Sequence, residues 1–332
     1  MIINSAKTDP NKILPIRYPW ARQYYKAAIA NNWTPEEVSM QKDVEQWKST
    51  RVLSNAERRL VLYNLGFFST AESLTANNIV LAVYQHVTSP EARQYLLRQA
   101  FEEAIHTDTF IYGCDSLSLD PDDVYNMYIR IPSIAAKDAF VVELTRTVFE
   151  PGFVTTGIAN IQRFLRDLVG FYVIMEGIFF YAGFAMMLAL RRQNKMVGAA
   201  EQYQYILRDE SMHCNFGIDL INTIKLENPY LWTRAFLEEV EELFKKAVEL
   251  EYRYAEDTLP RGILGLNTAM FKEYLRFIAN RRASQIGLAP LYPGAGNPFP
   301  WMSEMVDLKK EVAFFERRPT EYQTGGALQW TD

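Results

Sequence analysis

Two of the three histidines in this chain follow a glutamate at the same short spacing. They lie in the segments Glu103-Ala-Ile-His106 and Glu210-Ser-Met-His213. Acidic residues are 40 of 332, about one in eight, so a chance repeat of this spacing is uncommon. Residues three apart on a helix share a face, and each pair can direct a carboxylate and an imidazole toward one metal. His86 has no acid three residues before it, and we interpret it as an ordinary histidine at a helix end.

Two further glutamates stand in apolar surroundings. Glu176 lies in the run Tyr-Val-Ile-Met-Glu-Gly-Ile-Phe-Phe, and Glu72, less clearly, in Phe-Phe-Ser-Thr-Ala-Glu-Ser-Leu. Ferritin-like dimetal bundles take one glutamate from each of two helices and a Glu-x-x-His pair from each of two others. The pattern therefore predicts one cluster of six metal ligands: Glu72, Glu103, His106, Glu176, Glu210 and His213. The alternatives are a buried acid paired with a basic residue at Glu176, and a solvated helix surface at Glu72.

This ligand set indicates which metals to expect. Four carboxylates and two imidazoles suit iron and manganese better than zinc, which takes fewer ligands and favours nitrogen and sulfur. The four negative charges offset two divalent ions, and bridging carboxylates can follow a change in metal geometry. Positions that the protein leaves open can bind dioxygen. The sequence therefore predicts a dinuclear redox centre rather than a hydrolytic site.

Helices must position these side chains, and apolar residues recur at helical spacing over most of the sequence. Strand signals are sparse, and Ser54 with Glu57 forms a capping-box pattern. The predicted helices cover residues 54–68, 69–87, 91–113, 121–130, 134–148, 154–190, 198–226, 231–259 and 268–286. We predict an all-α, ferritin-like helical bundle with extra helices. It forms one domain over residues 1–316, followed by a flexible tail over 317–332 that contains proline and two glycines.

Composition excludes several classes of function. The net charge of −5 and the pI near 5.5 argue against a nucleic-acid-binding surface. The two cysteines, Cys114 and Cys214, do not form the framework of a disulfide-rich protein. Lys7, Asp9 and Lys12 interrupt any apolar run at the start of the sequence, so we expect no secretory signal and a cytoplasmic protein.

The segment from residue 168 to residue 190 has the length of a membrane span. Its single charged residue is Glu176, near the middle, where an ionised carboxylate would be costly in lipid. A buried central helix of a large bundle explains the segment better. We therefore expect no association with a membrane.

In these features the sequence resembles the small, radical-generating subunit of class I ribonucleotide reductase. The resemblance runs from about Pro19 to the C-terminus, and the six predicted ligands match the family's order. The segment Trp33-Thr-Pro-Glu-Glu-Val resembles the family's N-terminal tryptophan motif, and Asp209 stands where the family places an acid beside the first metal histidine. The resemblance implies an electron-transfer route from the metals through His106, Asp209 and Trp33. It also implies that the tail docks on a separate large subunit and that Tyr322 continues the route there.

Two positions depart from the family's commonest pattern. The radical tyrosine of the family follows the first metal histidine by four residues, and that position is Phe110. The first ligand is usually aspartate, and here it is Glu72. Both departures resemble the class Ic subgroup, which stores the oxidising equivalent on a manganese–iron centre; diiron and dimanganese centres remain open. Tyr205 resembles a subgroup tyrosine that helps to deliver an electron during activation, and a plain core tyrosine is the alternative.

The resemblance implies a radical-generating subunit of ribonucleoside-diphosphate reductase that forms a homodimer. With its large subunit, it would generate a cysteine radical there for deoxyribonucleotide synthesis. A competing hypothesis is a ligand-binding dimetal oxidase of the same superfamily, which links a valine to a tyrosine. Thr75 and Phe171 occupy those two positions and cannot form the link. Ferritin-like metal storage and a helical scaffold without metal are two more hypotheses.

Overall fold

The structure, a computed structural model, describes residues 1–5, 12–74, 79–263 and 265–302. Within these ranges the regular elements are helices, and extended pairing is limited to a single bridge between Ile263 and Leu266. The α-helices are α1 (Pro19–Ala30), α2 (Gln41–Lys48), α3 (Asn55–Leu74), α4 (Val80–His86), α5 (Pro90–Leu117), α6 (Pro121–Tyr125), α7 (Met127–Arg130), α8 (Pro132–Leu144), α9 (Ile158–Leu168), α10 (Tyr181–Arg192), α11 (Val197–Glu227), α12 (Arg234–Thr258) and α13 (Thr268–Gln285). A π-helix, η4 (Val169–Phe179), joins α9 to α10, and the 3-10 turns are η1 (Pro35–Glu37), η3 (Arg146–Phe149) and η5 (Pro229–Leu231). The predicted all-α fold is confirmed.

Local capping explains where α3 and α5 begin. The Ser54 hydroxyl accepts a hydrogen bond from the Glu57 N–H at 3.3 Å, and the Glu57 carboxylate accepts one from the Ser54 N–H at 2.8 Å. This is the predicted capping box. Before α5, Ser89 accepts from the Ala92 N–H at 3.3 Å, and Pro90 takes the first helical position, where its missing N–H has no partner to lose. The two caps determine where each helix starts and thereby the phase of the side chains further along it.

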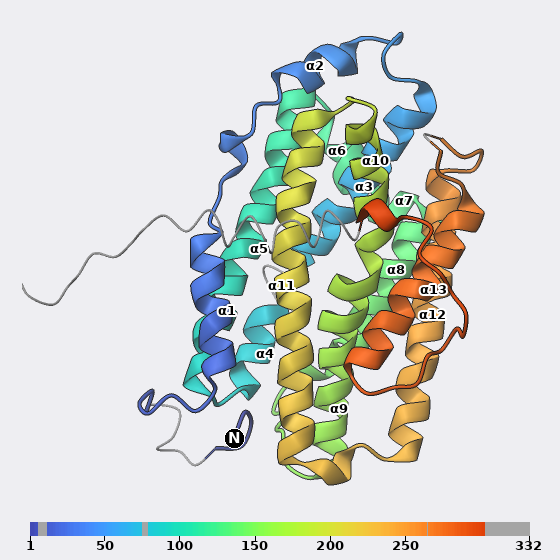
Figure 1. Cartoon of the computed structure of the whole chain (residues 1–332). Helices are drawn as coiled ribbons and strands as arrows, with labels where there is room; N and C mark the ends of the chain where they lie inside the picture. The colour runs from blue at the N-terminus through green and yellow to red at the C-terminus, as the bar shows by residue number, and fades with distance from the viewer. Residues whose placement is uncertain (6–11, 75–78, 264, 303–332) are drawn as a thin grey trace, which may run out of the picture. The chain divides into compact units, whose positions relative to one another are not determined.

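Four elements, α3, α5, η4 and α11, surround the centre of the bundle. α5 packs against α3 and α11, and α11 packs along η4. Figure 1 shows α5 and α11 running side by side. The approach of η4 to α11 requires Gly217, because a Cβ at that residue would lie 2.0 Å from Cγ of Tyr172. The apolar η4 segment can therefore reach the core because Gly217 carries no Cβ.

Two predicted boundaries are wrong. α3 continues without a break through residues 68 and 69, because the hydroxyls of Ser69 and Thr70 bond back to the Gly66 carbonyl and leave the helix intact. The helix predicted over 154–190 begins instead at Ile158, and it has π geometry over its middle third. No helix is predicted over α1 and α2, which are short and bury few side chains.

The helical stretch Ile158–Arg192 is long and apolar enough to cross a membrane by length and composition alone. Its most apolar window is wholly buried inside the protein. Glu176, within this stretch, is 0% exposed. The interpretation of the stretch as a buried central helix is therefore confirmed.

By its contacts, the chain up to Pro298 forms one compact unit, and the described residues from Phe299 onward are assigned to a second unit. All of the helices named above belong to the first unit. The predicted domain boundary after residue 316 and the predicted tail over 317–332 lie outside the described residues. Tyr322 and Thr75 lie outside them as well.

Candidate metal centre

The six predicted ligands converge from the four central elements. α3 and η4 each contribute one glutamate, and α5 and α11 each contribute a Glu-x-x-His pair. All six side chains are fully buried: Glu72, Glu103, His106, Glu176, Glu210 and His213. Helical spacing explains each pair, but only the packing of four elements brings the pairs and the single glutamates together.

The cluster consists of two groups of four residues that share two carboxylates. The groups are Glu72, Glu103, His106 and Glu210, and Glu103, Glu176, Glu210 and His213. Within each group, one potential ligand atom from every residue lies within 4.8 Å of the others. We name the two places the His106 position and the His213 position. Two adjacent positions with shared carboxylates are the arrangement of a bridged metal pair.

The two imidazoles face the shared carboxylates, and their ring centroids lie 6.0 Å apart. Nδ1 of His106 lies 3.1 Å from Oε1 of Glu210 and 3.4 Å from Oε2 of Glu103. Nδ1 of His213 lies 3.1 Å from Oε1 of Glu103. The two oxygens of Glu103 thus face different positions, as a bridging carboxylate requires.

Buried atoms without hydrogen-bond partners test whether the cluster fits metal ions. Among the described residues, eight such atoms belong to it: both carboxylate oxygens of Glu72 and of Glu210, Oε2 of Glu103 and of Glu176, and Nδ1 of His106 and of His213. Buried polar groups are nearly always paired, so each exception needs an explanation. Here the eight atoms belong to the residues that form the two positions, and each is a lone-pair donor when deprotonated. The donor set therefore fits two metal ions.

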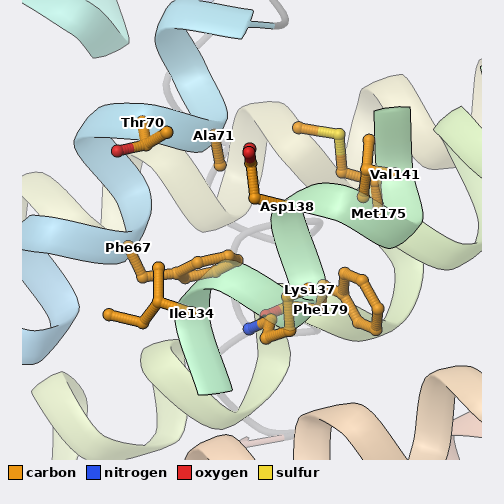
Figure 2. Close-up of a pocket in the computed structure, with 9 residues that line it drawn as sticks. All are labelled: Phe67, Thr70, Ala71, Ile134, Lys137, Asp138, Val141, Met175 and Phe179. Atoms are coloured by element: carbon orange, nitrogen blue, oxygen red, sulfur yellow. Dashed lines mark hydrogen bonds between the residues drawn. The ribbon is translucent and has the colours of Figure 1, made fainter. Parts of the chain in front are cut away.

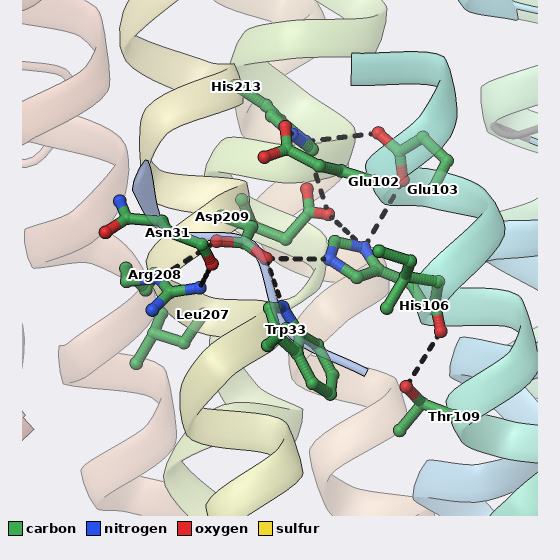
Figure 3. Close-up of polar contacts among 12 residues, drawn as sticks. Asn31, Trp33, Glu102, Glu103, His106, Thr109, Leu207, Arg208, Asp209 and His213 are labelled. Atoms are coloured by element: carbon green, nitrogen blue, oxygen red, sulfur yellow. Dashed lines mark hydrogen bonds and ion pairs between the residues drawn. The ribbon is translucent and has the colours of Figure 1, made fainter. Parts of the chain in front are cut away.

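A buried carboxylate holds the outer nitrogen of each histidine. Nε2 of His106 lies 3.4 Å from Oδ2 of Asp209, and Nε2 of His213 lies 3.0 Å from Oε2 of Glu102 (Figure 3). Such a contact selects the tautomer in which Nδ1 presents its lone pair to a metal. Asp209 stands where the resemblance implies. Glu102 is not among the predicted residues, and its local spacing indicates only the helix ion pair that it forms with Arg98 at 3.3 Å.

Asp209 also connects His106 to an aromatic row. The Trp33 Nε1–H donates to Oδ2 of Asp209 at 2.7 Å, and the Trp33 ring lies 6.3 Å from that of His106 (Figure 3). The Tyr205 ring lies 5.2 Å from Trp33. Arg208 donates through Nε to Oδ1 of Asp209 at 3.0 Å. The structure thus places in one row the residues for which the resemblance implies electron transfer, apart from Tyr322.

Burial and mutual repulsion act on the acids of the cluster. The pKa values of Glu72 and Glu176 lie well above their usual range, first because of burial and then because of the Glu210 carboxylate. Burial lowers the pKa of His106, but the Glu72 carboxylate and a hydrogen bond with Asp209 outweigh it and hold that pKa well above its usual range. Protons therefore compensate part of the negative charge in the metal-free cluster.

Apolar rings surround the residue that stands in the place of the family's radical tyrosine. Phe110 follows His106 by one helical turn and is buried. Its ring lies 5.9 Å from that of Phe68 and 5.8 Å from that of Tyr203. Phe110 has no hydroxyl group to oxidise. Tyr203 has a hydroxyl group, but it is buried, and the residues that the structure describes offer no acceptor for its proton.

A small cavity lies between α3, α8 and η4 (Figure 2). Ala71 and Met175, the immediate neighbours of Glu72 and Glu176 in sequence, contribute to its lining, as does the buried Lys137. The volume of the cavity is about 10 Å³, which is room for about one water molecule. As bounded by the described residues, it is too small for a lipid-sized ligand.

The fold and the cluster define a class of protein: a ferritin-like helical bundle with a carboxylate–histidine centre suited to two metal ions. The chain belongs to the family described as "Ribonucleotide reductase, small chain", whose sequence model matches residues 10–298. The predicted identity as a small subunit of ribonucleotide reductase, an oxidoreductase, is confirmed. Class I members of this family bind a dinuclear metal centre, in agreement with the two positions found here.

Several relatives match the protein over nearly its whole length. The ribonucleoside-diphosphate reductase subunit beta of Chlamydia pneumoniae is 58% identical, over 99% of this protein and 94% of the relative. The ribonucleoside-diphosphate reductase subunit M2 of Danio rerio is 30% identical, over 98% and 79%. The ribonucleotide reductase R2 subunit from Clostridium botulinum has a TM-score of 0.83 at 29% identity, over 92% of this protein and 93% of that one. The dimanganese(II)-NrdF of Streptococcus sanguinis, at 20% identity and a TM-score of 0.74 over 89% and 98%, shares the fold.

Proposed function

We propose that the six clustered residues bind two metal ions and that the protein uses them to generate the oxidising equivalent for a ribonucleotide reductase large subunit. The observation that carries this proposal is the convergence of eight buried, unpartnered donor atoms on two positions with shared carboxylates. When bound, the metal pair supplies one-electron redox chemistry. Membership of the small-chain family supports a role in deoxyribonucleotide synthesis.

The residues of the chain hold and shield the centre. Glu103 and Glu210 would each contribute to holding both metal ions, because each belongs to both groups. Asp209 and Glu102 orient the two imidazoles through Nε2, which leaves Nδ1 free to bind. The ring of Phe110 and its aromatic neighbours keep water away from the adjacent turn of α5.

We propose a manganese–iron pair in preference to diiron or dimanganese. A phenylalanine at position 110 cannot hold a stable phenoxyl radical, so the oxidising equivalent has to reside on the metals. Glutamate rather than aspartate as the first ligand, at Glu72, is the second departure that supports the class Ic assignment.

The contacts also support a route for electron transfer. Trp33 passes an electron toward His106, since Asp209 joins the two rings and an indole is oxidised more readily than any aliphatic group. We propose that Tyr205, whose ring lies 5.2 Å from that of Trp33, delivers an electron to the same route during activation. We propose that Tyr322 continues the route in the tail that docks on the large subunit.

Metal loading followed by oxygen tests the proposal. Metal-free protein is loaded with manganese, iron or both without oxygen, exposed to oxygen, and examined by metal analysis and electron paramagnetic resonance. We expect two metal ions per protomer, no tyrosyl signal, and nucleotide reduction with the large subunit only when both metals are present. A stable, stoichiometric tyrosyl radical in active protein would overturn the metal-stored equivalent. Glu176→Ala tests the ligand assignment. If this variant still retains two tightly bound ions, Glu176 is not a metal ligand.

We further propose that the protein is a cytoplasmic homodimer that binds neither nucleic acid nor membrane. Both cysteines, Cys114 and Cys214, are buried and unpaired, which suits a reducing compartment. Two-fold dimers are the commonest soluble oligomers, and the yeast Rnr4 structure, at 22% identity, is described as a homodimer. Sedimentation at micromolar concentration should give the mass of a dimer, and a monomer would contradict this part of the proposal.

A further inference from the structure

Gln99 lies on α5 one helical turn before Glu103 and is fully buried. Its Nε2 donates to Oε1 of Glu176 at 3.0 Å and lies 3.3 Å from Oε1 of Glu103. Its Oε1 accepts a hydrogen bond from the Tyr172 hydroxyl at 3.1 Å. One amide thus touches carboxylates on two different elements, η4 and α5.

The orientation of this amide follows from the groups around it. A carboxylate that holds a metal ion is ionised and only accepts hydrogen bonds, so the NH₂ group of Gln99 must face Glu103 and Glu176 when the cluster binds metal. Its carbonyl oxygen then faces Tyr172, whose hydroxyl donates. Gly217 makes room for the ring of Tyr172, because a Cβ there would lie 2.0 Å from its Cγ. The result is a single directed row from Tyr172 through Gln99 to the two carboxylates.

Both oxygens that Gln99 contacts belong to the His213 position. Oε1 of Glu103 lies 3.1 Å from Nδ1 of His213, whereas its Oε2 faces His106 and has no hydrogen-bond partner. Glu176 belongs to the His213 group alone. In the His106 group, neither oxygen of Glu72 has a hydrogen-bond partner within the described part of the chain. The two positions therefore differ in how firmly the protein orients their carboxylates.

We propose that Gln99, oriented by Tyr172, is a positioning residue for the metal ion at the His213 position and not for the ion at the His106 position. This inference rests on the proposed function, since it assumes that the cluster binds two ions. Gln99 holds Oε1 of Glu176 and leaves Oε2 as the oxygen directed at the metal. Loss of the amide lets the Glu176 carboxylate rotate, so the affinity of one position falls while that of the other persists.

Manganese(II) alone is the probe, titrated into metal-free protein while electron paramagnetic resonance counts the free ion. Loss of an outer partner of a metal ligand typically lowers affinity about 10–100-fold, and we expect Gln99→Leu to have an effect of this size on one of the two ions. Tyr172→Phe keeps the amide but frees it to turn, and should cause a smaller loss at the same position. Gln202→Leu is the matched control, since Gln202 is also buried but donates to the Pro35 carbonyl at 3.2 Å.

Two backgrounds identify which position is weakened. In His106→Gln, the His213 position is the one that keeps its histidine. Adding Gln99→Leu to this variant should lower the affinity of the His213 position by the whole factor of about 10–100. In His213→Gln the same addition should change little. Equal losses in both backgrounds, or none in either, would overturn the positioning role. Failure of the unaltered protein to bind two ions would instead overturn the proposed function. If Gln99→Leu does not fold, Tyr172→Phe in the same two backgrounds gives the same comparison.

Discussion

Asp209→Asn is a small change at the carboxylate that joins His106, Trp33 and Arg208. Oδ2 lies 3.4 Å from Nε2 of His106 and 2.7 Å from Nε1 of Trp33. Oδ1 accepts from Nε of Arg208 at 3.0 Å. All three partners act as donors, so an amide must turn its NH₂ group toward at least one of them. The Arg208 side chain is 21% exposed and can turn to solvent, so we expect the amide oxygen to stay with His106 and Trp33.

The magnitude follows from replacing a charged acceptor with a neutral one. Burial opposes the charge of Asp209, but the hydrogen bond with His106 and the charge of Arg208 outweigh it and hold the pKa below its usual value. The acceptor is therefore ionised at neutral pH, and charge-assisted hydrogen bonds are about twice as strong as neutral ones. We expect the affinity of the His106 position to fall about 10–100-fold, which is about 1.4–2.8 kcal/mol. The His213 position should keep its affinity, because Glu102 supports its histidine.

Manganese(II) titration of metal-free protein measures both affinities, and urea denaturation checks that the variant is folded. Glu102→Gln is the matched control, because it makes the same change beside His213 and should weaken that position instead. Trp33→Phe leaves the contact between Asp209 and His106 in place, so metal affinity should persist while nucleotide reduction falls. Unchanged affinity in Asp209→Asn, or equal weakening of both positions, would refute the reasoning.

Three further predictions concern groups away from this contact. Burial raises the pKa of Asp167 to about 7, so the folded protein holds a proton that the unfolded chain loses near pH 4. Relative to Asp167→Asn, the protein should lose up to about 4 kcal/mol of unfolding free energy as pH rises from about 4 to about 7. Denaturation of both proteins across this pH range measures the difference in stability. A difference that stays constant with pH would contradict the prediction. Lys137→Met leaves the Glu251 carboxylate buried without the ammonium 2.5 Å away and should cost about 3–5 kcal/mol of unfolding free energy. The double variant Lys137→Met with Glu251→Leu should regain most of that free energy. A loss in the double variant as large as in the single one would count against the prediction. Tyr322→Phe should leave metal loading and large-subunit binding intact while nucleotide reduction falls by orders of magnitude, and near-normal turnover would exclude the tail relay.

The six residues that the fold brings into one cluster could be named from the sequence because their signals are local. A Glu-x-x-His spacing puts both side chains on one helical face wherever the helix packs. Glu176 is conspicuous because its whole segment is otherwise uncharged, and Ser54 with Glu57 marks the start of α3 through a local cap. The predicted break between residues 68 and 69 is wrong, because the hydroxyl residues Ser69 and Thr70 lie inside the helix and bond to its own backbone.

Only the tertiary structure decided which oxygen and nitrogen atoms of the cluster have hydrogen-bond partners in the protein and which do not. Gln99 contacts Glu176 across 77 residues, and Glu102 contacts His213 across 111 residues. Neither residue carries a local mark of its partner, because a polar side chain on a helix has the same spacing signal whether it faces water or a distant carboxylate. The phase of side chains around a helix follows from backbone hydrogen bonds between residues four apart, so it can be predicted from sequence spacing. The pairing of individual oxygens and nitrogens depends on how closely α3, α5, η4 and α11 approach, which Gly217 and the other packed side chains determine only in the folded protein.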